Sequence, residues 1–371
     1  MKLLPLYLLL LPAFAISQYK VTLILDSVPA KPVADKIYVS GNFNNWDPAD
    51  PETELVKDAN GKFTKIFTDA SAVDYEYKFT LGSWQTVECA ANGADIPNRK
   101  LTLHSDTVLH FAIAAWKKAP TEAPKHTTSK NVQVIDTAFA IPQLQRTRRI
   151  WVYLPADYNS SKKKFPVLYL HDGQNVFDAA TSYAGEWGVD EALDSLSISD
   201  KPSIVVGIDN GGQHRMQEYN CSDNEKFGKE EGKAYLDFIV NTLKPYIDGH
   251  YRTLTDSKHT AIAGSSMGGL ISFYALLNYP STFGAGGIFS PSFWIIENKL
   301  PGSYAALKDK QLYFFYGALE GPPIVASTDK MMASLKGISG MQMKLAVDKQ
   351  GNHNESTWRK AFPAFYKWWN K

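Results

Sequence analysis

The sequence predicts an α/β domain with a mostly parallel central sheet, preceded by a small all-β sandwich domain. The first third of the chain holds short alternating strand-like runs separated by turn clusters. A segment rich in proline, threonine and lysine follows, and after it strand-like runs alternate with helical stretches. A chain of 371 residues is also longer than most single cores, so two domains are expected.

Residues 1–17 are expected to be a secretory signal peptide. Lys2 supplies a positive start, residues 3–11 form an apolar stretch too short to span a bilayer, and Ala13 to Ala15 match a small-residue cleavage site. The alternative is a buried N-terminal helix. The expected location is therefore secreted or periplasmic, and no later apolar run reaches the length of a membrane span.

Residues 18–116 are predicted to form the β-sandwich, because short strands at this spacing are typical of that architecture. Residues 117–130 have almost no large apolar side chain and are expected to be an exposed linker. The strand-like runs before this linker include 21–25, 36–40, 75–80 and 108–112.

Residues 131–371 are predicted to form the α/β domain. Alternation of strands and helices implies βαβ units and a largely parallel sheet that is covered on both faces. The expected strands lie at 149–154, 167–170, 204–208, 260–263, 312–316 and 343–347, and the expected helices at 186–196, 232–246, 267–278 and 357–369.

The stretch Gly264–Gly268 is a G-x-S-x-G pattern between an expected strand and an expected helix. This context is typical of a nucleophile elbow, a tight turn that exposes a serine hydroxyl above the sheet. Ser266 is therefore the candidate nucleophile. The next backbone N–H, that of Met267, is a candidate donor to an oxyanion.

A serine hydroxyl needs a base within hydrogen-bond reach. In proteins with a nucleophile elbow the chain order is serine, acid, histidine, so the base should follow the elbow. His353 is the only histidine after Ser266, so it is the candidate base. Glu320 is the preferred acid because it follows an expected strand, and Asp348 and Asp329 remain alternatives. A Ser–His pair without a third member also remains open.

The second oxyanion donor is expected in the loop His171–Asn175, which follows the expected strand 167–170. Gly173 allows that backbone to turn inward, and the N–H of Gln174 is the candidate. His171 is expected to be a hydrogen-bonded structural histidine, because no partner spacing supports a metal ligand.

Composition narrows the expected partners. The net charge is +1, and the longest basic run, Lys162 to Lys164, is expected to be a solvated loop, so a nucleic-acid partner is not expected. The two cysteines, Cys89 and Cys221, are more readily interpreted as isolated thiols than as a disulfide. No Cys/His metal pattern occurs, and neither a metal nor a cofactor is expected.

The second domain resembles the esterase D family of α/β-hydrolases, which includes feruloyl, acetyl-xylan and siderophore esterases. This resemblance implies a Ser266 nucleophile, a His353 base and an acid near Glu320, which together hydrolyse an ester in two acyl-transfer steps. It implies a feruloyl, acetyl or acylated-saccharide ester as substrate, with a siderophore ester as the alternative. The matching residues are His171–Asn175, Gly185–Trp187, Gly207–Gly211, Arg215, Glu218–Tyr219, the elbow, Gly351–His353 and Trp358.

Within that resemblance, Trp187, Arg215 and Tyr219 are candidates to line the substrate cleft. The alternative is that these three residues belong to the core or anchor loops.

The first domain contains a characteristic pattern from Ser40 to Pro48, followed by Tyr75–Phe79, Trp84, Val87–Glu88 and Asn98–Arg99. By these residues it resembles starch-binding modules of carbohydrate-binding module family 20 and their glycogen-binding relatives. By position, Trp46, Lys78 and Asn98 would contact an α-glucan, and Trp84 is the only candidate for a second stacking indole. The alternative for this domain is a spacer or a lid. For the whole chain, a further alternative to the two esterase hypotheses is a glucan-binding protein with an inactive hydrolase domain.

Overall fold

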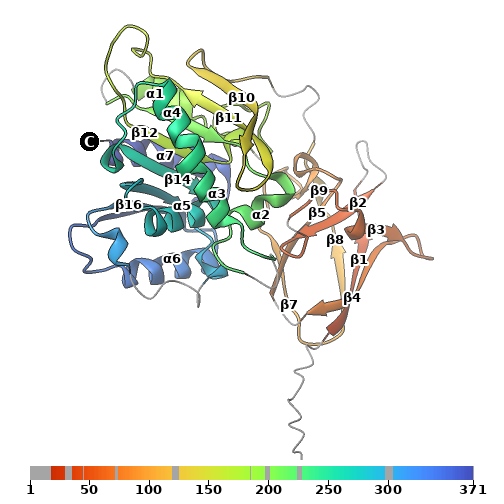
Figure 1. Cartoon of the computed structure of the whole chain (residues 1–371). Coiled ribbons are helices and arrows are strands. Elements are labelled where there is room, and N and C mark those ends of the chain that lie inside the picture. Colours follow the sequence, from red (N-terminus) through yellow and green to blue (C-terminus); the bar gives the residue numbers. More distant parts are fainter. Residues whose placement is uncertain are drawn as a thin grey trace, which may run out of the picture. The chain divides into compact units, whose positions relative to one another are not determined.

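The structure, a computed structural model, describes residues 18–29, 36–44, 46–71, 74–118, 125–183, 185–196, 201–223, 228–296 and 304–370. The predicted signal peptide lies outside the described residues. The chain divides into two compact units, Met1–Thr121 and Glu122–Lys371 (Figure 1).

The first unit is rich in β-structure, as predicted. Seven strands form a sheet in the order β7-β5-β2-β3-β4-β1-β8, and β6 and β9 form a separate pair. Neighbouring strands of the larger sheet are antiparallel, except that β1 and β8 are parallel. The strands are β1 Gln18–Ser27, β2 Ile37–Gly41, β3 Glu54–Lys57, β4 Phe63–Ser71, β5 Asp74–Thr80, β6 Glu88–Cys89, β7 Arg99–Thr102, β8 Thr107–Ala112 and β9 Ala115–Trp116.

This seven-stranded sheet folds over onto itself. Phe79 on β5 and Phe111 on β8 lie far apart in the strand order, yet their ring centroids are 5.4 Å apart. Strand β3 pairs with both β2 and β4 and so joins the two halves. The two halves therefore enclose one apolar core, and β3 makes the sheet around it continuous.

The second unit contains an eight-stranded sheet in the order β10-β11-β13-β12-β14-β15-β16-β17. The pairs from β13 to β17 are parallel, and β10 and β11 form an antiparallel edge. The predicted α/β fold with a mostly parallel sheet is confirmed. The strands are β10 Val132–Ile141, β11 Arg146–Tyr153, β12 Val167–His171, β13 Ile204–Ile208, β14 Thr260–Ser265, β15 Ala285–Phe289, β16 Gln311–Gly317 and β17 Gln342–Asp348.

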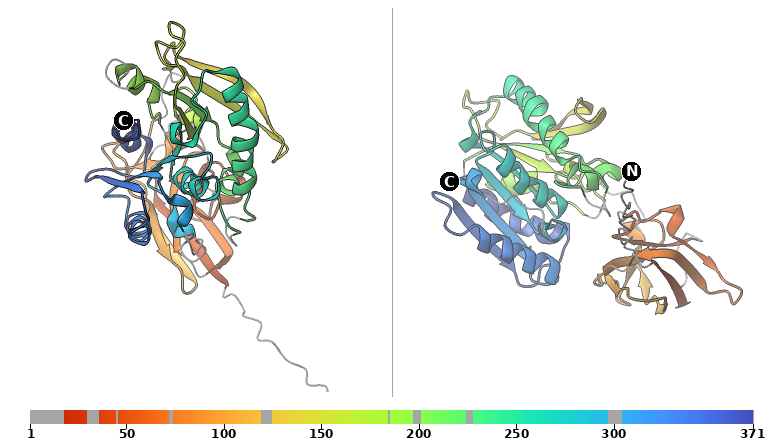
Figure 2. Two further views of the ribbon diagram at one scale, coloured as in Figure 1. Left: turned by 60° about the vertical axis from the view of Figure 1, so that its left-hand side comes forward. Right: turned by 60° about the horizontal axis from the view of Figure 1, so that its bottom comes forward.

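Helices cover both faces of this sheet (Figures 1 and 2). Along β12, Val167 and Tyr169 belong to a core with α3 to α6, whereas Leu168 and Leu170 belong to a second core with α1 and α7. The strand is apolar on both faces because both are buried. The helices are α1 Val189–Leu196, α2 Arg215–Glu218, α3 Gly232–Phe238, α4 Lys244–His250, α5 Met267–Asn278, α6 Pro322–Ser334 and α7 Glu355–Trp369.

The sequence prediction missed β10 and β15. In β15, Gly286 and Gly287 lower the strand propensity that such a prediction relies on. Both glycines are required by packing: a Cβ at Gly286 would lie 2.5 Å from a Leu276 methyl on α5, and one at Gly287 would lie 2.8 Å from Phe365 on α7. Helix α6 begins with two prolines, which are compatible with a first helical turn.

No helix among the described residues is both long enough and apolar enough to cross a membrane. Cys89 and Cys221 are free thiols, as the sequence favoured, and burial raises the pKa of Cys221 to about 12.

Candidate active site

The carboxyl ends of four neighbouring parallel strands carry the site. Ser266 follows β14, the loop Ser290–Ser292 follows β15, Glu320 follows β16 and His353 follows β17. Since these strands are adjacent and parallel, the loops after them lie at one edge of the sheet, where ligands bind in open α/β folds.

Ser266 occupies a strained turn between β14 and α5. Its φ of 58° and ψ of −119° lie outside the helical and strand regions, and its N–H donates to Phe289 O at 2.9 Å. A Cβ on Gly264 would meet the backbone of Gly268 at 3.0 Å, so a side chain there would force the turn to shift. Met267 is the first residue of α5, and its N–H has no carbonyl partner within the helix.

The hydroxyl of Ser266 is directed to a neighbouring loop. Its Oγ lies 3.3 Å from Ser292 Oγ, and among the described residues it has no hydrogen bond to His353. Bonds between nucleophile and base are often long or misaligned in the free state of an enzyme and tighten with substrate.

His353 and Glu320 form a direct pair. Nδ1 of His353 lies 2.8 Å from Glu320 Oε2, and the carboxylate is fully buried whereas the imidazole is 36% exposed. Because an ionised carboxylate can only accept, Nδ1 of His353 carries the proton of this bond, and in a neutral imidazole Nε2 then holds the lone pair. A base in this tautomer can accept a proton from a serine hydroxyl.

The other two candidate acids bond elsewhere. Asp348 accepts from Gln350 N at 3.0 Å, and Asp329 accepts from Tyr316 Oη at 3.0 Å. Of the three carboxylates considered in the sequence, the structure therefore brings Glu320 to His353.

The acid loop and the base loop touch through their backbones. A Cβ on Gly317 would lie 2.3 Å from Gly351 O, so a side chain there would collide with backbone. Ala318 N donates to Asp348 O at 2.8 Å, and Leu319 N donates to Gly351 O at 3.0 Å. These contacts fix the separation of the two loops.

The loop predicted to supply the second oxyanion donor lies beside the elbow. A Cβ on Gly268 would lie 3.3 Å from His171 Cβ and 3.4 Å from Asp172 Oδ2. Gln174 belongs to a 3-10 turn, Gly173–Asn175, and is only 4% exposed. The loop that carries Gln174 therefore packs against the turn that carries Met267.

A buried ion pair holds this loop. Arg215 donates to both carboxylate oxygens of Asp172 at 2.7 and 2.8 Å, and Asn210 Nδ2 donates to Oδ1 at 2.7 Å. Burial opposes ionisation of Asp172, but Arg215 and Asn210 outweigh it and hold the pKa below its ordinary value. Burial lowers the pKa of His171 to about 3, and its Nδ1 bonds Tyr235 Oη at 2.9 Å, which fits the expected structural histidine.

The three candidates for lining the cleft lie in the core or hold loops. Trp187 is 5% exposed and packs against Phe289 and Trp358. Tyr219 is fully buried, and its hydroxyl accepts from Asp172 N at 3.3 Å. Arg215 is committed to Asp172. The burial of Trp187 and Tyr219 favours the core and loop-anchoring alternative for these two residues, whereas the side chain of Arg215 is 24% exposed.

In the first unit, Trp46 and Trp84 lie together. Their ring centroids are 6.0 Å apart with the planes inclined at 47°. Lys78 lies on β5, where burial lowers its pKa, and Asn98 directly precedes β7, the neighbouring strand. Nδ2 of Asn98 donates to Glu76 Oε2 at 3.2 Å.

One group of acidic side chains in the described part of the chain has oxygens close enough for a metal ion. Ligand atoms of Glu186, Asp190 and Glu191 lie within 4.8 Å of one another. Burial, with a contribution from Glu191, raises the pKa of Asp190 to about 7. Arg359 approaches Glu186 at 3.4 Å and Glu191 at 3.8 Å, so a guanidinium already compensates part of this charge.

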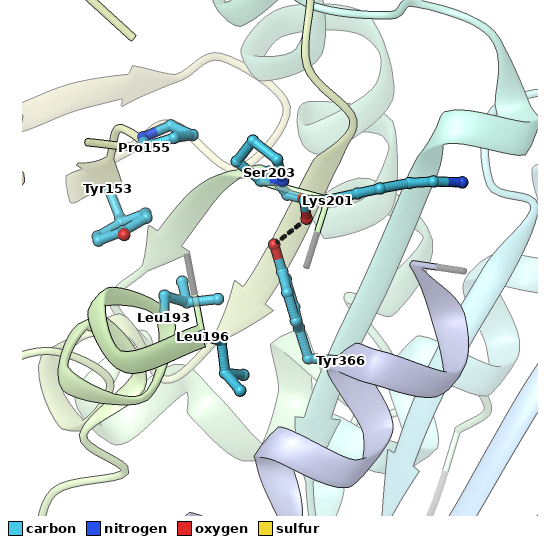
Figure 3. Close-up of a pocket in the computed structure, with 8 residues that line it drawn as sticks. Tyr153, Pro155, Leu193, Leu196, Lys201, Ser203 and Tyr366 are labelled. Atoms are coloured by element: carbon cyan, nitrogen blue, oxygen red, sulfur yellow. Dashed lines mark hydrogen bonds between the residues drawn. The ribbon is translucent and has the colours of Figure 1, made fainter. Parts of the chain in front are cut away.

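A small pocket lies at the opposite edge of the sheet (Figure 3). Ser203 directly precedes β13, and Tyr153 ends the antiparallel strand β11, which places both at the amino ends of the parallel strands. Tyr366 Oη donates to Lys201 O at 2.9 Å across this pocket (Figure 3). None of the predicted site residues lines this pocket. Its lining consists of Tyr153, Pro155, Leu193, Leu196, Lys201, Pro202, Ser203 and Tyr366.

Sequence reasoning missed the contribution of the loop Ser290–Ser292. Ser290 Oγ donates to Glu320 Oε1 at 2.6 Å, and Ser292 contacts the hydroxyl of Ser266. The signal that could have found this loop is two serines directly after a short apolar run, but that run, β15, was not predicted as a strand.

A serine at a strand-to-helix turn, with a His–Glu pair in later loops of a mostly parallel sheet, defines the α/β-hydrolase class. Residues 141–368 match the model of the Esterase family, described as "Putative esterase". The match covers more than half of the 371 residues, and the chain belongs to this family. It is a carboxylic ester hydrolase.

Curated relatives agree with this class. Over 223 residues the chain is 28% identical to an endo-1,4-beta-xylanase/feruloyl esterase of Xylanibacter ruminicola, covering 56% of this chain and 27% of that protein. Over 230 residues it is 26% identical to the iron(III) enterobactin esterase of Escherichia coli K12, covering 58% and 52%. A stretch of 77 residues is 42% identical to an alpha-amylase of Niallia circulans, covering 20% and 6%. The chain thus spans about half of the enterobactin esterase and smaller parts of the other two.

Solved structures share the fold. A ferulic acid esterase superposes with a TM-score of 0.51 at 23% identity, covering 65% of this chain and 98% of its own. The enterobactin esterase of Shigella flexneri superposes with a TM-score of 0.51 at 17% identity, covering 89% and 87%.

Glu355 is a buried carboxyl between the base loop and the oxyanion loop. It is the first residue of α7, is 9% exposed and accepts from Asn175 Nδ2 at 3.4 Å. Burial raises its pKa to about 7; Asp172 adds to the shift, and His353 and Arg215 oppose it.

This raised pKa predicts a pH-dependent stability. The folded state holds the Glu355 proton more tightly than the unfolded state, so the free energy of unfolding falls as pH rises from about 4.5 through about 7. From pH 5 to pH 8, Glu355 is expected to lower the free energy of unfolding by about 2 kcal/mol. Denaturant unfolding at both pH values should show a smaller fall for Glu355→Gln than for the wild type. The exposed Asp136→Asn serves as control and should follow the wild type; an equal fall in all three proteins contradicts the assignment.

Proposed function

We propose that the protein is a serine esterase that hydrolyses a hydroxycinnamoyl or acetyl ester of a saccharide. The observation that carries the proposal is the bond between His353 and the buried Glu320, beside the strained turn that presents Ser266. Each of the three groups in a serine-hydrolase mechanism has a counterpart at this edge of the sheet.

In the proposed reaction, the hydroxyl of Ser266 turns from Ser292 toward the imidazole and attacks the ester carbonyl. Nε2 of His353 accepts its proton, and the carboxylate of Glu320 stabilises the resulting imidazolium. The N–H groups of Met267 and Gln174 receive the oxyanion. The alcohol leaves with a proton from His353, and a water activated by the same residue then releases the acid and restores the serine.

The substrate class is supported by the feruloyl esterase among the relatives. A siderophore ester is the second candidate. The fold of the Shigella flexneri enterobactin esterase matches 89% of this chain, whereas the Esterase family model matches residues 141–368. The ratio of kcat/KM for methyl ferulate to that for a cyclic catecholate trilactone decides between the two, and a ratio well below one favours the siderophore ester.

The triad assignment predicts two large losses of rate. Ser266→Ala should lower kcat for p-nitrophenyl acetate by about 10³-fold or more, because the nucleophile is lost. Glu320→Gln should lower kcat by about 10²- to 10⁴-fold, because an amide no longer holds the tautomer with a proton on Nδ1. Steady-state rates and labelling of position 266 by a fluorophosphonate measure both effects.

Matched variants separate these effects from general damage. Asp348→Asn and Asp329→Asn make the same chemical change at the alternative acids and should keep kcat within about threefold. Exposed Ser160→Ala should be neutral. If Ser266→Ala keeps the wild-type rate, the serine mechanism is wrong; if Asp348→Asn alone abolishes activity, the acid is misassigned.

We further propose that the first unit binds an α-glucan through Trp46 and Trp84. Two half-buried indoles 6.0 Å apart offer apolar faces on which sugar rings stack. The similarity of a 77-residue stretch to an alpha-amylase supports the same ligand class. Lys78 on β5 and Asn98, directly before β7, are the proposed polar contacts.

This proposal predicts retention in starch. Wild-type protein should be retarded in affinity electrophoresis through soluble starch, and Trp46→Ala should lose most of that retardation, because one stacking face is removed. Ile66→Ala, which changes an exposed apolar residue on β4, should be retarded like the wild type. Equal mobility of all three with and without starch contradicts the proposal, and retention without ester turnover favours a glucan-binding protein with an inactive hydrolase unit.

We propose export on the basis of residues 1–17 alone. Intact-mass measurement of protein from the native cell should show loss of the chain through Ala15 or Ser17. Retention of Met1 to Ser17 in the mature protein contradicts export by this route.

A further inference from the structure

The loop after β15 contacts the proposed triad at both ends. Ser292 lies against the hydroxyl of Ser266, and Ser290 Oγ donates to Glu320 Oε1 at 2.6 Å. Ser290 in turn accepts from the indole N–H of Trp358 at 2.8 Å. A chain of hydrogen bonds therefore runs from Trp358 through Ser290 to Glu320 and on to His353.

We propose that Ser290 and Trp358 are positioning residues, which fix the carboxylate of Glu320 against His353. The proposal rests on the proposed function, in which that carboxylate is the acid of a serine esterase. Neither residue touches the substrate in this mechanism. Both act through Glu320.

The direction of the chain follows from donor and acceptor chemistry. An indole N–H can only donate, so the oxygen of Ser290 must be the acceptor in its bond with Trp358. A serine hydroxyl has a single proton, and this arrangement directs that proton to Glu320. Oε1 of Glu320 also accepts from Gly317 N at 2.6 Å, so two donors hold it and Oε2 is left for His353.

Burial and backbone conformation support a dedicated role for Ser290. The residue is fully buried and has a φ of 43°, a conformation that is costly for a side chain other than glycine. Its N–H donates to Phe315 O at 2.6 Å, on the strand that leads to Glu320. Glycine would relieve the backbone strain at this position but would leave the carboxylate without its hydroxyl donor.

Trp358 connects the same chain to the base. Its ring is 5% exposed and meets the imidazole of His353 edge to face, with centroids 5.1 Å apart and planes at 87°. One side chain thus restrains His353 by packing and Glu320 by way of Ser290. The position five residues after the base, on the first turn of α7, allows both contacts.

The test measures kcat, KM and the pH profile with p-nitrophenyl acetate. Ser290→Ala removes a hydrogen bond to a charged group and should lower kcat by about 10- to 100-fold. KM should stay within threefold. The acidic limb of the kcat/KM profile should move to lower pH, because a displaced carboxylate stabilises the imidazolium less. Trp358→Phe keeps the packing against His353 and removes only the N–H, so it should give a smaller loss in the same direction.

Double variants decide whether the two residues act through Glu320. In a Glu320→Gln background, Ser290→Ala should have no further effect, and Ser290→Ala with Trp358→Phe should equal Ser290→Ala alone. Ser203→Ala removes another buried serine hydroxyl, at the opposite edge of the sheet, and should leave kcat unchanged. Unfolding midpoints show whether each variant folds. If Ser290→Ala does not fold, the measurements on Trp358→Phe replace it in the test.

The outcomes separate this inference from the proposed function. If Glu320→Gln lowers kcat while Ser290→Ala and Trp358→Phe do not, the positioning role is wrong and the triad stands. If Glu320→Gln has no effect, the assigned acid is wrong and the positioning role falls with it. Full additivity of Ser290→Ala and Glu320→Gln also overturns the inference, because it means that Ser290 acts independently of the carboxylate.

Discussion

The bond between the buried carboxylate of Glu320 and the imidazole of His353 is the interaction on which the site depends. A carboxylate without solvent needs donors, and Glu320 has three: the imidazole, a serine hydroxyl and a backbone N–H. Each donor comes from a different part of the chain, so the charge can be buried only when β15, β16 and β17 are already in register. Burial of this charge without those partners would cost several kcal/mol.

The sheet supplies that register. Strands β14 to β17 are adjacent and parallel, and every loop of the site leaves the same edge. Helices on both faces of the sheet exclude water from it. Helix α5 follows the strained serine turn on one face, and α7 follows the base loop on the other. The positions of Ser266 and His353 are therefore set by elements that bury large apolar areas rather than by the polar contacts of the site itself.

The sequence predicted the parts of this arrangement that leave a local pattern. Apolar runs predicted the strand before the elbow and the helix after it, and the G-x-S-x-G spacing with a single later histidine predicted which side chains form the site. It could not predict β15, because Gly286 and Gly287 are there for the packing of Leu276 and Phe365, which only the folded chain brings close. Missing that strand also hid Ser290 and Ser292. The choice among Glu320, Asp348 and Asp329 depended on loop geometry, and Trp187 and Tyr219 could not be separated from cleft residues without knowing their burial.

The backbone contact between Gly317 and Gly351 has a consequence for the diversity of such proteins. The segment between these two glycines contains α6 and β17, and the contact holds its two ends together. Insertions or deletions within that segment can reshape what surrounds an incoming molecule while the spacing of acid and base stays constant.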